Sequence, residues 1–145
     1  MSLSEKSCVV QNMKDNGVVP IGKLSATDLD HTDGGKTVIL RSPSPSAETP
    51  VWQEVKLTPA TNLKSATVTP IGSDGKPTGQ ATTATPSSPS TPTTIKFTAP
   101  TSADHVVVEL HPATPGKPTD AAVASVVACM PDEGMEELIL RLYGI

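Results

Sequence analysis

The chain has very few aromatic residues. Of its 145 residues only Trp52, Phe97 and Tyr143, or 2%, are aromatic. A core must therefore be built mainly from Val, Ile, Leu and Ala, and such a core has little bulk per residue and favours two sheets packed face to face. This length predicts one domain, which can bury about two thirds of the surface of its unfolded chain.

Basic residues are scarce as well. The chain has 11 Lys and Arg against 15 Asp and Glu, for a net charge of -4. A nucleic-acid-binding surface needs basic stripes and often stacking aromatics, so we expect no nucleic-acid partner. No apolar run approaches the roughly 18 residues of a membrane span. The opening MSLSEKS lacks the features of a secretory signal, so the chain is either cytosolic or a fragment of a secreted protein.

The prolines, in contrast, are numerous. Fifteen of them alternate with short apolar runs such as KTVILR, ADHVVVELH and AAVASVVACM. This pattern predicts short strands joined by proline-containing loops, and thus an all-β fold. In VWQEVKLTP, strict alternation places Trp52, Glu54 and Lys56 on one face of a strand. We nevertheless expect Trp52, as the bulkiest side chain available to a thin core, to pack inside.

The chain has two cysteines, Cys8 and Cys129, near opposite ends of the apolar part. A disulfide between them would join the first strand of a secreted sandwich to its last. Closing so long a loop would stabilise the fold by about 4 to 5 kcal/mol in a chain-entropy account. The other interpretation is a pair of buried thiols that pack as small apolar groups.

Residues 79–94, GQATTATPSSPSTPTT, are rich in Ser, Thr and Pro. Such a composition is typical of segments that carry O-linked sugars in secreted proteins. A bare loop between two strands explains it equally well. We therefore predict a loop over 79–94, with O-glycosylation as an open question.

The segment LSATDLDHTDGGKT concentrates acidic residues before two glycines, and we interpret it as a loop. Asp28, Asp30 and Asp33 could supply oxygen ligands to a structural Ca²⁺, which binds six to eight oxygens. The spacing is not that of an EF-hand, because the sixth and twelfth positions from Asp28 hold Asp33 and Ile39. The alternative is a solvated polar turn.

Nothing in the chain predicts catalysis. No serine or cysteine lies in a nucleophile motif, and no glycine-rich phosphate loop precedes a helix. His105 and His111 flank the strand VVVEL and fall on the same face as Glu109 and Val107, which we expect to be the solvent side. We therefore expect a protein that is not an enzyme and has no cofactor beyond the calcium discussed above.

Residues 131–145 follow a different pattern. Asp132 can cap a short amphipathic helix whose apolar stripe is Met135, Leu138, Ile139, Leu142 and Tyr143. Such a helix is too short to be stable alone, so the stripe needs a surface to cover. That surface is either the sandwich of its own chain, or a protein partner or second copy.

The ordered series CVVQNM, LSATDLDH, LRSPSPSAETPVW, VKLTPATNLKSATVTP, TTIKFTAP, HVVVELHP and VVACM resembles the discoidin-like, galactose-binding-like modules of extracellular mucin-like and von Willebrand-type proteins. The resemblance covers Cys8 to Cys129 and includes Arg41 followed by Trp52. It implies an eight-stranded jelly-roll sandwich that serves adhesion or matrix assembly. Some members bind sugars or lipids through end loops, or hold calcium, but no ligand-binding residue can be carried over to this chain.

The sequence thus predicts a jelly-roll-like β-sandwich of about eight short strands with a C-terminal helix. Its expected parts are an extension over 1–7, a sandwich over 8–130 and a tail over 131–145. We expect a secreted structural or adhesion module that presents loops and the terminal helix. Two alternatives stay open: a calcium-dependent carbohydrate-binding module, and a subunit of a viral or intracellular assembly.

Overall fold

The structure is a computed structural model that describes residues 7–12, 24–41, 49–86 and 93–130. These residues form nine strands, and the predicted all-β fold is confirmed. The strands are β1 (Ser7–Asn12), β2 (Ser25–Asp30), β3 (Lys36–Arg41), β4 (Val51–Leu57), β5 (Leu63–Ile71), β6 (Thr82–Ala84), β7 (Thr93–Ser102), β8 (His105–Pro112) and β9 (Val123–Met130). The predicted helix within 131–145 lies outside the described residues.

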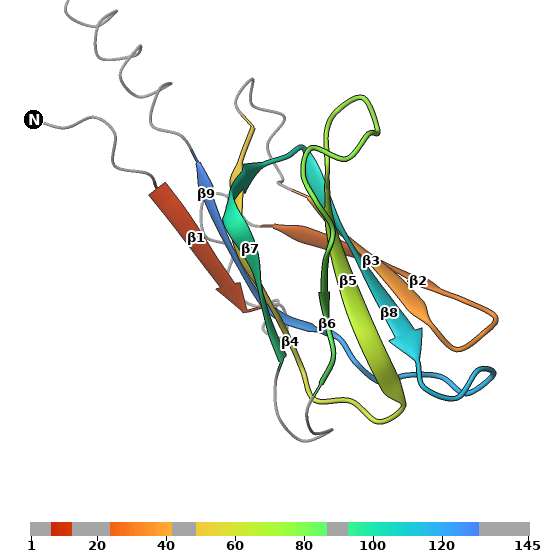
Figure 1. Cartoon of the computed structure of the whole chain (residues 1–145). Coiled ribbons are helices and arrows are strands. Elements are labelled where there is room, and N and C mark those ends of the chain that lie inside the picture. Colours follow the sequence, from red (N-terminus) through yellow and green to blue (C-terminus); the bar gives the residue numbers. More distant parts are fainter. Residues whose placement is uncertain (1–6, 13–23, 42–48, 87–92, 131–145) are drawn as a thin grey trace, which may run out of the picture.

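The nine strands form two antiparallel sheets (Figure 1). The first has the order β1-β9-β4-β7, and the second has the order β2-β3-β8-β5-β6. In the first sheet the first and last of the described strands are neighbours, because β1 pairs with β9 along its whole length. Most connections pass from one sheet to the other, while β2–β3 and β5–β6 are hairpins within the second sheet.

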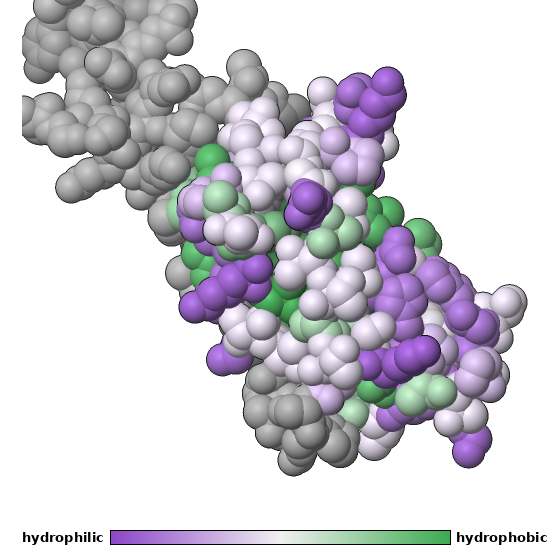
Figure 2. Space-filling view, viewed as in Figure 1, coloured by the Kyte–Doolittle hydropathy of each residue, from purple (hydrophilic) through white to green (hydrophobic). Residues whose placement is uncertain are grey.

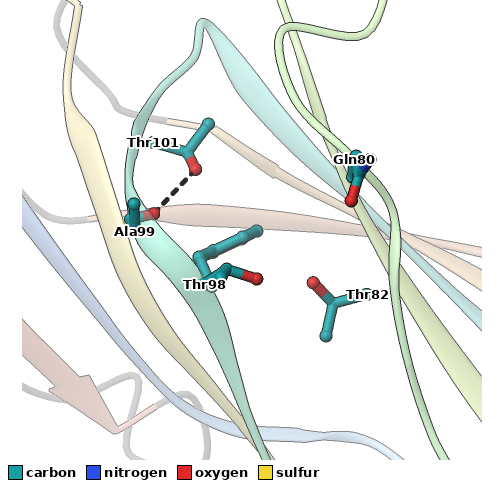
Figure 3. A pocket seen from close by; sticks show the side chains of 6 residues that line it. Gln80, Thr82, Thr98, Ala99 and Thr101 are labelled. Atoms are coloured by element: carbon teal, nitrogen blue, oxygen red, sulfur yellow. Dashed lines mark hydrogen bonds between the residues drawn. The ribbon is translucent and has the colours of Figure 1, made fainter.

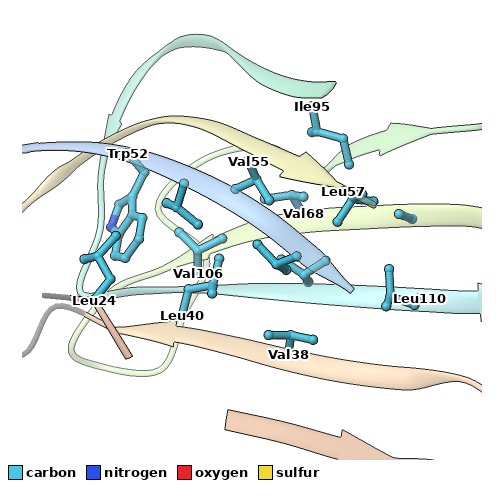
Figure 4. Close-up of a cluster of buried hydrophobic side chains, with 14 of the residues drawn as sticks. Leu24, Val38, Leu40, Trp52, Val55, Leu57, Val68, Ile95, Val106 and Leu110 are labelled. Atoms are coloured by element: carbon cyan, nitrogen blue, oxygen red, sulfur yellow. The ribbon is translucent and has the colours of Figure 1, made fainter. Parts of the chain in front are cut away.

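Side chains from both sheets meet in one buried cluster (Figure 4). As the composition predicts, its members are mostly Val, Leu, Ile and Ala. The side chain of Trp52 is the largest and is fully buried, as expected. Its indole Nε1 donates a 2.8 Å hydrogen bond to the carbonyl of Ala103, which satisfies the one polar atom of the ring. The core therefore lies between the sheets and holds them together.

Strands β5 and β8 follow the alternation that a half-buried strand requires. In β8, Val106, Val108 and Leu110 are buried, while Glu109 is exposed. The prediction that the odd-numbered positions of this strand face solvent is confirmed. These two central strands of the second sheet set which of its faces meets the core.

Strand β4 departs from the predicted alternation. Trp52, Val55 and Leu57 are all buried, although Trp52 and Val55 are an odd number of positions apart. The cause is a β-bulge: Trp52 pairs with Ala128 and Glu54 with Val127, so Gln53 is an extra residue relative to β9. A bulge reverses the facing of the residues that follow it. The strict alternation predicted for this strand is therefore wrong, and the bulge explains why.

Two segments predicted as loops contain strands. The acidic segment begins with β2, whose six residues are all exposed. Within 79–94, Thr82–Ala84 form β6, and β7 begins at Thr93. Both β2 and β6 are edge strands held by backbone pairing on one side only. Neither strand has the alternation of apolar and polar residues that identifies a strand from sequence, so β2 and β6 could not be predicted in this way.

Candidate functional site

The acidic segment folds into a β-hairpin. Residues 31–35 join β2 to β3, and the turn itself is formed by the three residues 32–34. It is closed by hydrogen bonds from the Gly34 N–H to the carbonyl of His31 (3.2 Å) and from the His31 N–H to the carbonyl of Gly35 (2.9 Å). Gly34 has a φ of 94°, the left-handed conformation that this type of hairpin loop requires at its third position.

The three aspartates of this hairpin do not converge. The Asp33 Oδ1 accepts a 2.8 Å hydrogen bond from the Gly35 N–H, and the Asp28 carboxylate lies 3.8 Å from the Lys36 ammonium. Asp30 is an exposed residue at the end of β2. Among the described residues there is no group of three acidic, histidine or cysteine side chains that could hold a metal ion. The geometry therefore does not provide the predicted calcium site at Asp28, Asp30 and Asp33.

The hairpin loop instead docks onto the β8–β9 connection. The carbonyl of Asp33 accepts a 2.7 Å hydrogen bond from the Gly116 N–H, and the carbonyl of Gly34 accepts one of 3.0 Å from the Thr119 N–H. A Cβ atom at Gly34 would lie 1.9 Å from the carbonyl oxygen of Lys117. Only glycine permits this close approach of two backbones.

Asn62 organises the same end of the molecule from the β4–β5 connection. Its side-chain Nδ2 donates to the carbonyls of Lys117 (2.7 Å) and Thr114 (3.3 Å), and its Oδ1 accepts from the Thr114 N–H (2.6 Å). Its own backbone has a φ of 58°. Asparagine is one of the few residues with a side chain that tolerates this conformation. Three connections distant in sequence thus form one hydrogen-bonded end, which we call the Asn62 end.

The three histidines lie on or beside the second sheet, and each has a hydrogen-bonding partner of its own. His105 Nδ1 lies 2.8 Å from the Asp104 carboxylate, and His111 Nε2 lies 3.3 Å from the Thr67 hydroxyl. His31 Nε2 lies 2.7 Å from the Thr37 hydroxyl. The sequence correctly placed His105 and His111 on one face. Each histidine, however, contacts its own local partner.

Among the described residues, two cavities lie away from the Asn62 end. One, of about 330 Å³, lies at the opposite end of the molecule and includes Ser73, Asp74, Ser102 and Asp104 in its lining. The other, of about 220 Å³, lies between the β6 and β7 sides (Figure 3). Gln80 and Thr82 line one side of it, and Phe97, Thr98, Ala99 and Thr101 line the other. Sequence reasoning missed both cavities, because each is formed by residues from different connections or strands.

The two cysteines lie in β1 and β9. Cys8 in β1 lies directly opposite Cys129 in β9 in the antiparallel register. Cys129 is buried, and no cysteine among the described residues is free. The predicted partner-binding residues Met135, Leu138, Ile139, Leu142 and Tyr143 lie outside the described residues. In the part of the chain that the structure describes, no helix has the length and apolar character needed to cross a membrane.

No protein-family model and no curated protein matches the chain.

Proposed function

We propose that the chain is a non-enzymatic structural or adhesion module of the extracellular space. In this proposal it is a jelly-roll-like β-sandwich whose first and last strands are joined by a Cys8–Cys129 disulfide. The single observation that carries the proposal is the register of β1 and β9, which pairs these two cysteines.

The register supports the disulfide on geometric grounds. Residues directly opposite in an antiparallel pair have Cα atoms about 4.5 to 5.5 Å apart, which is within the range that disulfides span. The chain has no third cysteine, so no other intramolecular pairing competes. Stable disulfides form mainly in oxidising environments such as the extracellular space. The proposed disulfide is therefore the reason for proposing an extracellular location.

The order of the strands supports the jelly-roll interpretation. The chain alternates between the sheets through β3, β4 and β5, and again through β6, β7, β8 and β9. As a result, β1-β9-β4-β7 faces β3-β8-β5-β6, and β2 extends the second sheet beyond β3. This interleaving of early and late strands is the double Greek-key pattern of jelly rolls, which serve as lectin and viral capsid domains. It agrees with the fold that the resemblance to discoidin-like modules implies.

The hydrogen bonds of the Asn62 end hold its connections in a fixed arrangement, which suits a structural or binding role. Its three connections are joined by hydrogen bonds between backbones and through one side chain. A surface that is ordered before binding loses less conformational entropy when a partner binds. We propose that the module presents this end, formed by residues 31–35, 58–62 and 113–122, to a protein or glycan partner.

A subunit of a viral or intracellular assembly is the second candidate, because jelly rolls also build capsids. The two candidates differ in the state of the cysteines. If the protein is recovered from its native source with Cys8 and Cys129 bridged, the extracellular module is supported. If both thiols are free there while the protein is folded, the assembly subunit replaces it.

A further inference from the structure

The two sheets have four edge strands, β1, β7, β2 and β6. β6 has only three residues, and in β7 the residues Phe97–Pro100 have no register partner in β4. Short strands, irregular pairing and prolines protect an edge against the addition of a further strand. The side chains of β1 are not among those that the structure describes. β2 differs from β6 and β7, because its six residues include no proline or lysine and pair with β3 in unbroken register.

The backbone of β2 has unpaired groups at regular spacing. Successive residue pairs of an antiparallel ladder alternate between hydrogen-bonded and non-hydrogen-bonded pairs. The series starts at the turn, where the His31 N–H donates a 2.9 Å hydrogen bond to the carbonyl of Gly35. The odd-numbered residues of β2 therefore bond to β3, whereas Ala26, Asp28 and Asp30 direct their N–H and C=O groups away from it. These outward groups are the ones to which an added strand would bond.

β2 is held in place at both ends, although all six of its residues are exposed. Leu24, directly before the strand, is buried in the core (Figure 4). After the strand, the hairpin loop is bonded to the β8–β9 connection through the carbonyls of Asp33 and Gly34. An edge that is ordered before binding loses little conformational entropy when a strand is added to it.

The acidic side chains of β2 limit which strands can be added. Asp28 stands opposite the buried Val38, and Asp30 opposite Lys36, so both carboxylates lie on the face of the sheet that meets the core. The Asp28 carboxylate lies 3.8 Å from the Lys36 ammonium, and among the described residues Asp30 has no ion-pair partner. Figure 2 shows hydrophilic residues gathered on the right of the view, where β2 lies in Figure 1. A second copy would bring two acidic edges together, whereas basic side chains would complement them.

The opposite face of β2 is partly apolar. Leu29 is 48% exposed and is the large hydrophobic side chain that stands out as exposed among the described residues. The half-buried Ile39 of β3 lies on the same face, opposite Thr27. Because successive side chains of a strand alternate between faces, an added strand that complements this edge has basic residues beside Asp28 and Asp30 and an apolar residue between them, beside Leu29.

We propose that β2 is a docking edge for an extended segment of a partner protein in which basic and apolar residues alternate. The segment is added to the second sheet as a further strand. Its backbone bonds to the outward groups of β2, its basic side chains lie beside the two carboxylates, and its apolar side chains cover Leu29. This proposal goes beyond the role of the Asn62 end and does not depend on the disulfide or on an extracellular location.

Amide hydrogen exchange of the full chain, followed residue by residue by NMR, tests this proposal. The probe is a short capped peptide in which lysine and valine alternate, and the control peptide has glutamate in place of lysine. In the free protein the amides of Ala26, Asp28 and Asp30 should exchange quickly, and those of Thr27 and Leu29 slowly. At saturation the lysine peptide should slow the three outward amides by at least about tenfold. The glutamate peptide should leave them unchanged.

Two variants separate backbone pairing from charge. Asp28→Pro removes an outward N–H that does not bond to β3, so the sandwich should keep its fold while the lysine peptide no longer binds. Asp28→Asn keeps the N–H and removes the charge, so it should weaken binding by about two- to fivefold. The matched control Asp74→Asn removes the same charge from the lining of the cavity at the opposite end of the molecule and should bind the peptide as the wild type does.

Three results would overturn the proposal. If the outward amides of β2 already exchange slowly in dilute free protein, another segment of the same chain pairs with this edge. If they become slow only as the protein concentration rises, the partner is a second copy. If neither peptide slows them, or both peptides do so equally, the edge does not select a basic strand.

Discussion

The side-chain amide of Asn62 donates a 2.7 Å hydrogen bond to the backbone carbonyl of Lys117, across 55 positions of sequence. The same side chain also contacts Thr114 through both its oxygen and its nitrogen. One residue in a left-handed conformation therefore joins the β4–β5 connection to the β8–β9 connection. We regard it as the central residue of the Asn62 end.

Replacing this residue tests its importance. Asn62→Ala removes three side-chain hydrogen bonds and puts a less tolerant residue at a φ of 58°. We expect the free energy of unfolding to fall by about 2 kcal/mol, or about 4 to 8 °C in melting temperature. Urea unfolding followed by fluorescence measures it. The exposed neighbour Lys64→Ala is the control, and equal stability of the two variants would contradict the assignment.

A comparison of two glycines separates backbone strain from steric exclusion. Gly34 and Gly75 have φ angles of 94° and 81°, but a Cβ at Gly34 would lie 1.9 Å from the Lys117 oxygen, whereas nothing lies within 4 Å at Gly75. Gly75→Ala should therefore cost about 1 kcal/mol, from conformation alone. Gly34→Ala should cost at least about 3 kcal/mol, because the two backbones must also separate. Similar melting temperatures for both variants would show that the hairpin does not dock as described.

Trp52 offers a direct probe of the core. It is the only tryptophan of the chain, it is fully buried, and its indole N–H is hydrogen-bonded to Ala103. The native protein should show blue-shifted fluorescence that iodide hardly quenches, and unfolding should reverse both properties. Trp52→Phe should lower the unfolding free energy by about 2 to 3 kcal/mol, since it leaves a cavity and an unpaired buried carbonyl. Strong quenching in the native state would place Trp52 on the surface.

Much of the core was predictable from the sequence. The alternation of Val106, Val108 and Leu110 with Glu109 identified β8 and its buried face, because successive side chains of a regular strand point to opposite faces of the sheet. The same reasoning failed in β4. The bulge at Gln53 depends on the pairing of β4 with β9 and β7, so it cannot be predicted from the residues of β4 alone.

The candidate sites were less predictable. Asp28, Asp30 and Asp33 are close in sequence, yet a hairpin and local partners separate their carboxylates. The role of Asn62 escaped notice, because it depends on contacts with residues far away in the chain. The pairing of Cys8 with Cys129 stays a prediction, which the register of β1 and β9 supports. Two cysteines in terminal strands leave one intramolecular pairing, whatever the fold between them.

The proposed disulfide predicts a large effect of reductant. It closes a loop of about 120 residues, so its reduction should lower the free energy of unfolding by about 2 to 5 kcal/mol. Urea unfolding with and without reductant measures this difference. The variant Cys8→Ser should have the lower stability in both conditions and should not respond to reductant. A wild-type protein whose stability is independent of reductant would contradict the bridge.

The most direct test of the account is the intact mass of the protein, isolated from its native source and alkylated in denaturant with and without prior reduction. We predict that no alkyl group is added without reduction and that two are added after it, because Cys8 and Cys129 are bridged. Two alkyl groups added without reduction would contradict the bridge. They would also remove the main support for an extracellular module.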